Sequence, residues 1–164
     1  MTRLLEGFKI VAIALALLGL AACSSKDKPD VAAVDVENAT PGSQRDFTIN
    51  VGDRVLFLVD QSTLTPQAQE ILRRQATWLK QYGQVTIQVE GHADERGTRE
   101  YNIALSARRA EASKNFLIAQ GIEPGRVSTI AFGKERPVAL CAEESCFSQN
   151  RRSVTVITAG AVAG

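Results

Sequence analysis

The chain has 164 residues, which is enough for one ordinary domain. Its hydrophobic content of 45% is sufficient for a core, and its formal net charge of +1 argues against binding to nucleic acid or to anionic lipid through bulk charge. We therefore expect recognition by this protein to depend on a local site.

The first 22 residues are predicted to be a signal peptide. A positively charged start precedes an apolar run that is too short to span a bilayer comfortably. The run ends in Leu-Ala-Ala before Cys23, and this ending resembles the signal of bacterial lipoproteins, which implies acyl chains such as palmitate on Cys23. An ordinary signal with a chance cysteine and an uncleaved anchor helix are the alternatives. By the same resemblance, Ser24 implies the outer membrane of a Gram-negative cell, with the domain facing the periplasm.

The next segment, residues 23–50, is predicted to be the lipidated N-terminus and a flexible tether. It is rich in Lys, Asp, Ala, Pro, Gly and Ser and has no sustained periodicity. As a random coil it would reach about 30 Å, so a membrane anchor and a bound domain could be occupied together. The folded domain is predicted to cover residues 51–158, and residues 159–164 are expected to fray.

Hydrophobic patterning predicts four strands and two helices. Thr65 and Thr98 are the predicted N-caps of the helices, and the first strand could begin as early as residues 47–51. The order β-α-β-α-β-β predicts an α/β two-layer sandwich, with a mixed four-stranded sheet and both helices on one face. The strand order within the sheet stays open. The predicted ranges, in chain order, are 54–59, 66–82, 85–90, 98–120, 127–132 and 154–157.

Residues 91–110, which join the second strand to the second helix, combine two opposite charges. Arg109 falls inside the apolar arc of the helix, whereas Arg108 projects among polar residues. A guanidinium at the edge of a core needs an anion or several acceptors, and Asp94 in the preceding loop is the nearest candidate. From the residues alone, an ion pair that fastens the loop to the helix is the favoured interpretation.

Three motifs resemble the peptidoglycan-binding domain of the outer-membrane protein A family. They are G-H-A-D-E-R-G from Gly91, Y-N-x-x-L-S-x-x-R-A from Tyr101, and N-R-R from Asn150. The resemblance covers about residues 55–156 and implies the same architecture. It also implies that Asp94 and Arg109 bind meso-diaminopimelate of the cell-wall stem peptide. The far end of that ligand carries an ammonium and a carboxylate, and a guanidinium can take the carboxylate through two parallel bonds.

The same resemblance suggests four further ligand-binding candidates of second rank. Phe57 has a stronger alternative as a core residue, and Asp60 could equally form a turn. Asn102 could face the cleft or brace the loop. Arg151 could contact the ligand or pair with an acidic loop residue.

The resemblance also implies a protein partner. The lipoprotein of this family that the motifs resemble belongs to the Tol system, which helps constrict the envelope at cell division and preserves the integrity of the outer membrane. The domain of that lipoprotein binds the periplasmic protein TolB through a surface that overlaps the wall site. Glu95, Arg96 and Arg99 are the candidates for this contact, and an ordinary solvated charge is the alternative for each.

The remaining chemistry of the chain is sparse. His92 is the single histidine and has no cysteine nearby, so no metal site is predicted, and His92 is expected to pack within the loop. No cofactor is expected either. Cys141 and Cys146 remain as a pair in an oxidising compartment and are predicted to form a disulfide, with a reduced pair as the alternative.

Two other classes of function compete with wall binding. A wall hydrolase would need a metal held by histidines, a nucleophile beside a base, or two separated carboxylates, and adjacent Asp94 and Glu95 do not supply that separation. The chain is therefore not expected to be an enzyme. A protein-contact module without wall binding is the second competitor, and the presence of both Asp94 and Arg109 argues against it. The expected function is a non-covalent link between the outer membrane and peptidoglycan.

Overall fold

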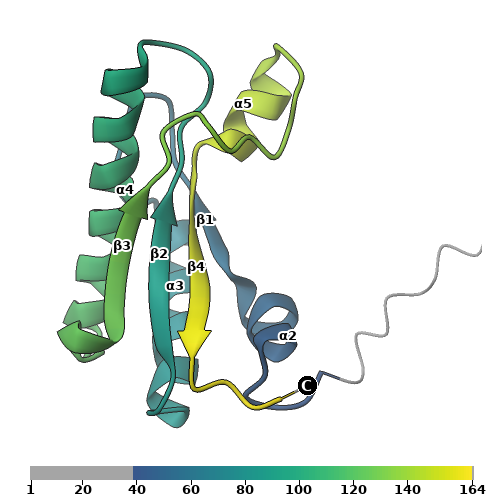
Figure 1. Ribbon diagram of the computed structural model, residues 1–164, viewed down its shortest axis with the longest axis vertical. Coiled ribbons are helices and arrows are strands. Elements are labelled where there is room, and N and C mark those ends of the chain that lie inside the picture. The colour runs from purple at the N-terminus through teal and green to yellow at the C-terminus, as the bar shows by residue number, and fades with distance from the viewer. Residues whose placement is uncertain (1–38, 164) are drawn as a thin grey trace, which may run out of the picture. The chain divides into compact units, whose positions relative to one another are not determined.

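The computed structural model describes residues 39–163 (Figure 1). The predicted signal peptide, Cys23 and most of the predicted tether lie outside the described residues. Among the helices that are described, none combines the length and the apolar character that a membrane span requires.

Four strands form one mixed sheet in the order β1-β4-β2-β3. Strand β4 runs antiparallel to both β1 and β2, while β2 and β3 are parallel. Parallel neighbours need a long crossover, and the second large helix provides it. The prediction of a mixed four-stranded sheet is confirmed. The strands are β1 (Arg54–Leu56), β2 (Thr86–Gly91), β3 (Val127–Ala131) and β4 (Arg152–Ala159).

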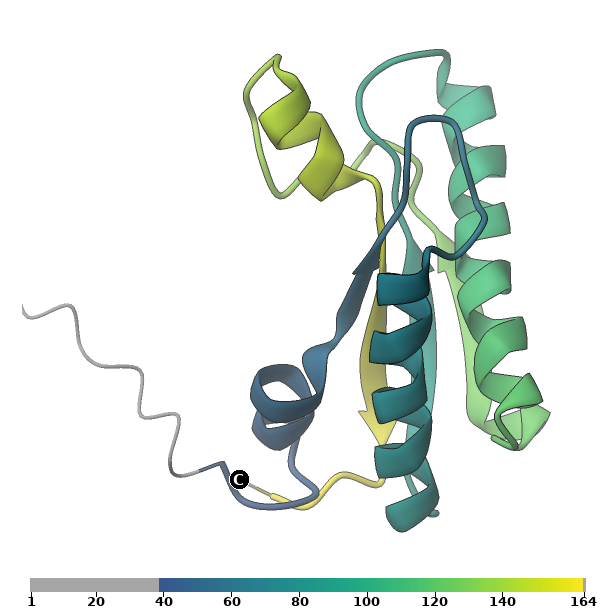
Figure 2. The same cartoon turned by 180° about the vertical axis from the view of Figure 1, so that it is seen from behind.

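Two long helices, α3 (Pro66–Gln81) and α4 (Arg99–Ala119), cover the same face of the sheet. They lie behind the sheet in Figure 1 and in front of it in Figure 2. The hydroxyls of Thr65 and Thr98 accept hydrogen bonds from backbone N–H groups of the first turns, as predicted for N-caps. Inward residues of β2 meet apolar residues of the helices in one core, so the two-layer α/β architecture is confirmed.

The first strand is shorter than predicted. It ends at Leu56, because the following carbonyls bind arginine side chains instead of another strand. The Phe57 carbonyl accepts from Arg151, and the Leu58 carbonyl accepts from Arg109. The Phe57 amide still donates to the Arg151 carbonyl at 2.8 Å, and residues 58–61 leave the sheet and form a loop beside the helices.

The folded region begins earlier than predicted. Residues 44–52 are helical, as α2 (Gln44–Asp46) and the π-helical turn η2 (Phe47–Gly52), rather than tether or strand. Phe47 is fully buried, with its ring centroid 4.9 Å from that of Trp78, and the Trp78 indole donates to Asp46 at 2.8 Å. Aromatic burial and this indole hydrogen bond explain why the segment does not remain a free linker.

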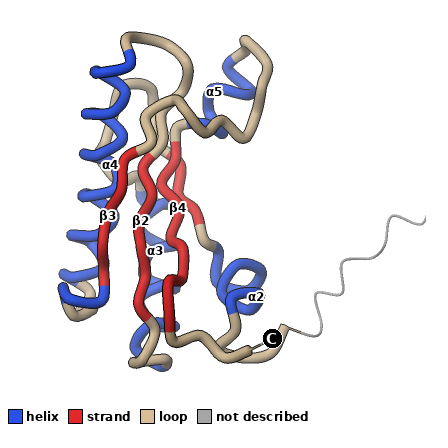
Figure 3. Tube along the Cα trace, viewed as in Figure 1, coloured by secondary structure: helices blue, strands red, loops and turns tan. Residues whose placement is uncertain are grey.

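The C-terminal segment is also held in place. The Val162 amide donates to the Gly42 carbonyl at 3.0 Å, and Ser43 and Val162 form a parallel β-bridge. The expected fraying from residue 159 is therefore not seen as far as Val162. Figure 3 shows this last segment beside the start of the described chain.

A short helix precedes the last strand, where the sequence predicted none. Helix α5 (Glu144–Asn150) follows the loop after β3, and η3 (Pro124–Arg126) is a single turn before β3. Cys141 and Cys146 form a disulfide across the start of α5, with their Cα atoms 5.6 Å apart. The Asn150 side chain accepts from the Val138 amide and donates to the Ala139 carbonyl, both at 2.8 Å. These bonds close the segment that carries α5.

Candidate functional site

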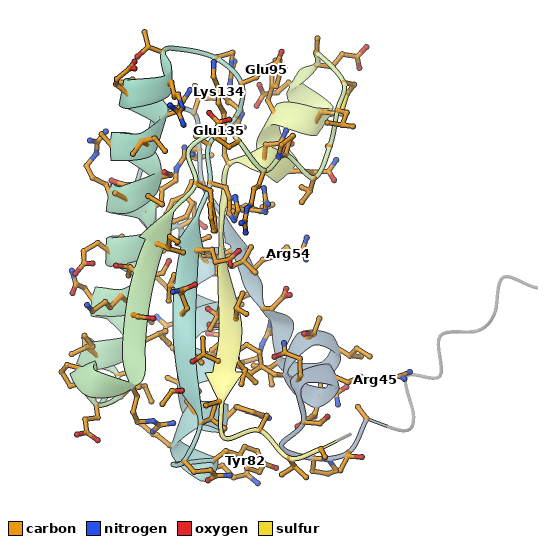
Figure 4. All side chains as sticks on the ribbon, viewed as in Figure 1. Arg45, Arg54, Tyr82, Glu95, Lys134 and Glu135 are labelled. Carbon is orange, nitrogen blue, oxygen red and sulfur yellow. A yellow bond between two sulfur atoms is a disulfide. The ribbon has the colours of Figure 1, made fainter. Side chains whose placement is uncertain are left out.

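A cavity of about 240 Å³ lies where β1 and β2 end and α4 begins. Figure 4 marks this end of the sheet with the labels of Glu95 and Lys134. The cavity brings together residues from three separate segments of the chain. It is lined by Val59, Asp60, Asp94, Arg96, Gly97, Tyr101, Asn102, Leu105, Arg109 and Arg151.

A close approach between β2 and α4 brings the loop and the helix together at this cavity. A Cβ atom at Gly91 would lie only 1.9 Å from the Ser106 carbonyl oxygen, so this position requires glycine. The Ser106 hydroxyl also accepts from the Gly133 amide at 2.9 Å. Gly97 has φ +93°, which lets the loop turn into α4.

Asp94 is an ionised carboxylate at the cavity. It is 7% exposed and accepts from Arg96 Nη2 at 2.6 Å, from the Arg96 amide at 3.1 Å and from Arg151 Nη1 at 3.2 Å. Burial by itself would raise the pKa of Asp94, but the hydrogen bonds from Arg96 and Arg151 outweigh it and keep the pKa below its ordinary value. Asp94 is therefore negatively charged at neutral pH.

Arg109 is a buried cation that lies against the same cavity. Its side chain donates to the carbonyls of Gln61 at 2.8 Å, His92 at 2.9 Å and Leu58 at 3.2 Å. Burial lowers the pKa of Arg109 to about 10; the nearby charge of Asp94 opposes this shift and that of Arg151 adds to it. The guanidinium is thus still charged at pH 7.

The two opposite charges are not directly paired. The salt bridges of Asp94 within the described residues go to Arg96 and Arg151, and Arg109 is satisfied by backbone carbonyls. A mutual ion pair of Asp94 and Arg109, which the residues alone favoured, is therefore not formed. Both side chains remain lining residues of one cavity.

The second-rank residues fall into two groups. Asp60 is exposed at the cavity, has φ 57°, and accepts a hydrogen bond from the Tyr101 hydroxyl. Asn102 also lines the cavity, and its amide braces the loop by donating to the Arg96 carbonyl at 2.9 Å. Phe57, in contrast, is 3% exposed and belongs to the core, with its ring beneath the Arg109 guanidinium.

Arg151 links three segments at the base of the site. It is 4% exposed and donates to Asp94, to the Phe57 carbonyl at 3.1 Å and to Glu144 Oε1 at 2.5 Å. Arg151 thus pairs with an acidic residue of the loop, Asp94, which is one of the two roles that the sequence left open. It also lines the cavity. Sequence reasoning missed Glu144, because nothing local connects it to a loop 50 residues earlier. It also missed Tyr101, although this residue stands in the Y-N motif.

The loop residues considered as partner contacts are exposed. Glu95, Arg96 and Arg99 all face solvent, and Arg99 forms a salt bridge with Glu135 at 3.1 Å. The Lys134 ammonium supports the loop from below by donating to the Glu95 and Gly97 carbonyls. The exposed loop is therefore attached to its neighbours by several polar contacts.

His92 packs within the loop. It is 2% exposed and stacks on Phe132 with ring centroids 5.5 Å apart. Burial, together with the charges of Arg152, Arg136 and Arg54, lowers the pKa of His92 to about 4. Over residues 39–163, no group of three or more His, Cys, Asp or Glu side chains is arranged to hold a metal ion.

The fold and the cavity define a class of protein: a two-layer α/β domain with a small binding site of mixed charge at one end of its sheet. Residues 56–151 match the OmpA family, which is more than half of the 164 residues. The chain belongs to the OmpA family.

Relatives in other bacteria are named peptidoglycan-associated lipoproteins. The protein from Mesorhizobium japonicum is 56% identical over 153 residues, which cover 90% of this chain and 91% of that protein. The protein from Agrobacterium fabrum is 51% identical over 162 residues, covering 96% and 91%. The crystal structure of the peptidoglycan-associated lipoprotein from Burkholderia pseudomallei superposes with a TM-score of 0.62 at 39% identity, covering 64% of this chain and 89% of that one. None of these names denotes an enzyme.

Proposed function

We propose that this protein binds peptidoglycan non-covalently through the meso-diaminopimelate residue of the stem peptide. In this proposal Asp94 accepts the ammonium at the far end of the ligand, and Arg109 donates to its carboxylate. The observation that carries the proposal is that one cavity is lined by both charged side chains while they are not paired with each other. The names of the relatives point to the same ligand class.

The hydrogen-bonding capacity of the two residues supports this assignment. A guanidinium has five N–H groups, and the three backbone carbonyls take one from each nitrogen of Arg109, which leaves two N–H groups for a carboxylate. Asp94 Oδ1 accepts one hydrogen bond, from the Arg96 amide, so it retains a second acceptor position.

The size of the cavity supports a small ligand group. Its volume of about 240 Å³ is below the roughly 300–1,000 Å³ of pockets that enclose drug-sized molecules. It suits the end of one amino-acid side chain rather than a whole peptide or a glycan. The aliphatic and aromatic lining residues Val59, Tyr101 and Leu105 would then surround the aliphatic part of the ligand.

The membrane end of the proposed link depends on the N-terminus. We propose cleavage of residues 1–22 and lipidation of Cys23, which would anchor the protein in the outer membrane with its domain in the periplasm. The name lipoprotein among the relatives supports this part. The chain before residue 39 would then span the distance between the membrane and the wall.

A role in the Tol system is the finer part of the proposal. The exposed loop residues Glu95, Arg96 and Arg99 stand beside the cavity, and Arg96 also lines it. A TolB contact at this loop would compete with the wall for the same surface. The proposed role of the complex is envelope integrity and constriction at cell division. Addition of TolB is expected to release the protein from peptidoglycan.

A sedimentation assay with purified sacculi tests the wall-binding proposal. In the full-length protein, Asp94→Asn is expected to weaken binding by about tenfold or more, because it removes the charge that pairs with the ammonium. Asp94 is the sharper test, since Arg109 also holds three backbone carbonyls.

Glu100→Gln, which removes an exposed charge at the start of α4, is the matched control and should bind like wild type. Free diaminopimelate should compete with sacculi for the wild-type protein. Unchanged binding by Asp94→Asn, with its melting temperature near that of wild type, would reject this site.

A further inference from the structure

The Arg96 guanidinium already occupies one oxygen of the carboxylate that the proposed ligand needs. Its Nη2 lies 2.6 Å from Asp94 Oδ2, which is the short distance of a charge-assisted bond. The Arg96 side chain is 44% exposed, whereas Arg151, the other arginine on Asp94, is only 5% exposed. Of the two cations on Asp94, Arg96 is thus the one that is free to move.

From the same position the Arg96 guanidinium also contacts two side chains of α5. Arg96 Nη2 is 3.6 Å from Glu144 Oε2, and its Cζ is 4.7 Å from the centre of the Phe147 ring. A carboxylate and an aromatic face together suit a guanidinium. Both residues belong to α5, which stands beside the loop at the same end of the sheet (Figures 1 and 2).

The charges at Asp94 favour movement when an ammonium arrives. Asp94 would then have three cations around one carboxylate, and like charges in such proximity disfavour one another. Arg151 cannot relieve this repulsion, because it is buried and tied to Phe57, Asp94 and Glu144. A shift of Arg96 toward Glu144 relieves it without breaking a buried contact.

We propose that Arg96 is an exchangeable counter-ion of Asp94, and that Glu144 and Phe147 receive it when a ligand ammonium binds. This inference rests on the proposed function and adds α5 to the site. The exchange makes the site selective, because only a ligand that brings its own cation can displace Arg96. A diacid without the second ammonium cannot displace Arg96, so the Asp94 carboxylate contributes nothing to its binding.

Calorimetric titration of the full-length protein with two probes tests the exchange. The probes are meso-diaminopimelate and 2-aminopimelate, which keeps both carboxylates but lacks the second ammonium. Arg96→Ala removes the competing cation, so the affinity for diaminopimelate is expected to rise about two- to fivefold, which is the effect of an exposed ion pair. The affinity for 2-aminopimelate should not change. Arg73→Ala, which removes an arginine of similar exposure that pairs with Glu70, is the control and should change neither.

The role of Glu144 is tested by a double-mutant cycle. Glu144→Gln keeps an acceptor for Arg151 but removes the charge that receives Arg96, so the affinity for diaminopimelate should fall about two- to fivefold. In an Arg96→Ala background the same substitution should have no effect. An equal loss in both backgrounds would show that Glu144 acts through Arg151, and would overturn the inference.

Different results would reject the exchange of Arg96 and the binding of the wall. Weaker binding of both probes by Arg96→Ala would mean that Arg96 contacts the ligand carboxylate, which overturns the exchange but leaves the wall-binding proposal intact. If wild-type protein does not bind diaminopimelate at all, the proposed function and the exchange both fall.

Discussion

Arg109 donates to the carbonyls of Leu58 and Gln61 in the loop after β1, and to that of His92 in the loop after β2. One side chain therefore ties two loops to α4. The planar guanidinium is suited to this role, because its donors point in fixed and different directions. The three hydrogen bonds that attach the loops to Arg109 also fix the position of its positive charge at the cavity.

We expect Arg109→Met to lower the free energy of unfolding by about 2–4 kcal/mol, because three backbone carbonyls lose their donor. Urea denaturation at pH 7 measures this loss. The exposed neighbour provides the control, since Arg108→Met should change the free energy by less than about 0.5 kcal/mol. Equal effects at the two positions would contradict the structural role of Arg109.

His92 makes stability depend on pH at the same end of the sheet. The pKa of His92 is about 4 in the folded protein, whereas the ordinary value of a histidine is 6.5; burial is the main cause of the decrease. Between these values the unfolded chain binds a proton that the folded protein does not, so the free energy of unfolding falls as the pH falls. The contribution is complete above pH 6.5 and is lost as the pH falls toward 4.

From pH 7 to pH 4.5 this linkage should lower the free energy of unfolding by about 2 kcal/mol. Replacement of the titrating ring in His92→Gln should remove most of that dependence, as measured by urea denaturation at a series of pH values. Asp94 acts in a separate window, because its lowered pKa places its loss of stability at more acidic pH. An unchanged slope in His92→Gln would assign the effect to other groups.

At the scale of single elements, α5 depends on its attachments more than on its own sequence. It has seven residues, and its N-cap residue, Glu143, makes no capping bond with its side chain. Its position is secured by the disulfide, by the Asn150 side chain and by the salt bridge from Glu144 to Arg151. This short helix thereby brings an acidic side chain to the site.

Replacement of both cysteines, Cys141→Ser with Cys146→Ser, is expected to lower the free energy of unfolding by about 2 kcal/mol, because a short closed loop becomes open in the unfolded chain. Chemical denaturation of the double variant measures the change. Wild-type protein treated with a reductant serves as the comparison and should show the same loss. No difference between the oxidised and reduced proteins would mean that the remaining contacts hold α5 by themselves.

At the scale of the whole folded unit, both ends of the described chain contribute to the structure. Phe47 lies in the core against Trp78, and Val162 pairs with Gly42 and Ser43. A domain cut at residue 51, the predicted boundary, would lose Phe47 from the core. The folded unit is thus larger than its two long helices and four strands.

Phe47→Ala should therefore lower the free energy of unfolding by about 3–5 kcal/mol, as expected when a buried aromatic ring is removed. Thr48→Ala, at the exposed next position, should have little effect. Thermal and urea denaturation of the two variants make the comparison. A flexible tether at this place would give equal and negligible effects.

Several features could be predicted because their causes are local. Thr65 and Thr98 begin the two long helices through side-chain bonds to the first turn, and alternation marks β2. Residues 57–59 were wrongly assigned to the first strand, since an apolar run cannot reveal that its carbonyls will meet Arg109 and Arg151. Similarly, the place of Phe47 depends on a Trp78 side chain 31 residues further on.

The sequence by itself determined the two-layer α/β class, the helix starts and the residues that carry charge at the site. Periodicity, capping and motif spacing are properties of neighbouring residues, and they are visible without coordinates. Only the tertiary structure decided that Asp94 pairs with Arg96 and Arg151, that Arg109 binds carbonyls, and that α5 adds Glu144. These partners are distant along the chain, and an ion pair forms according to distance and burial in space rather than separation in sequence.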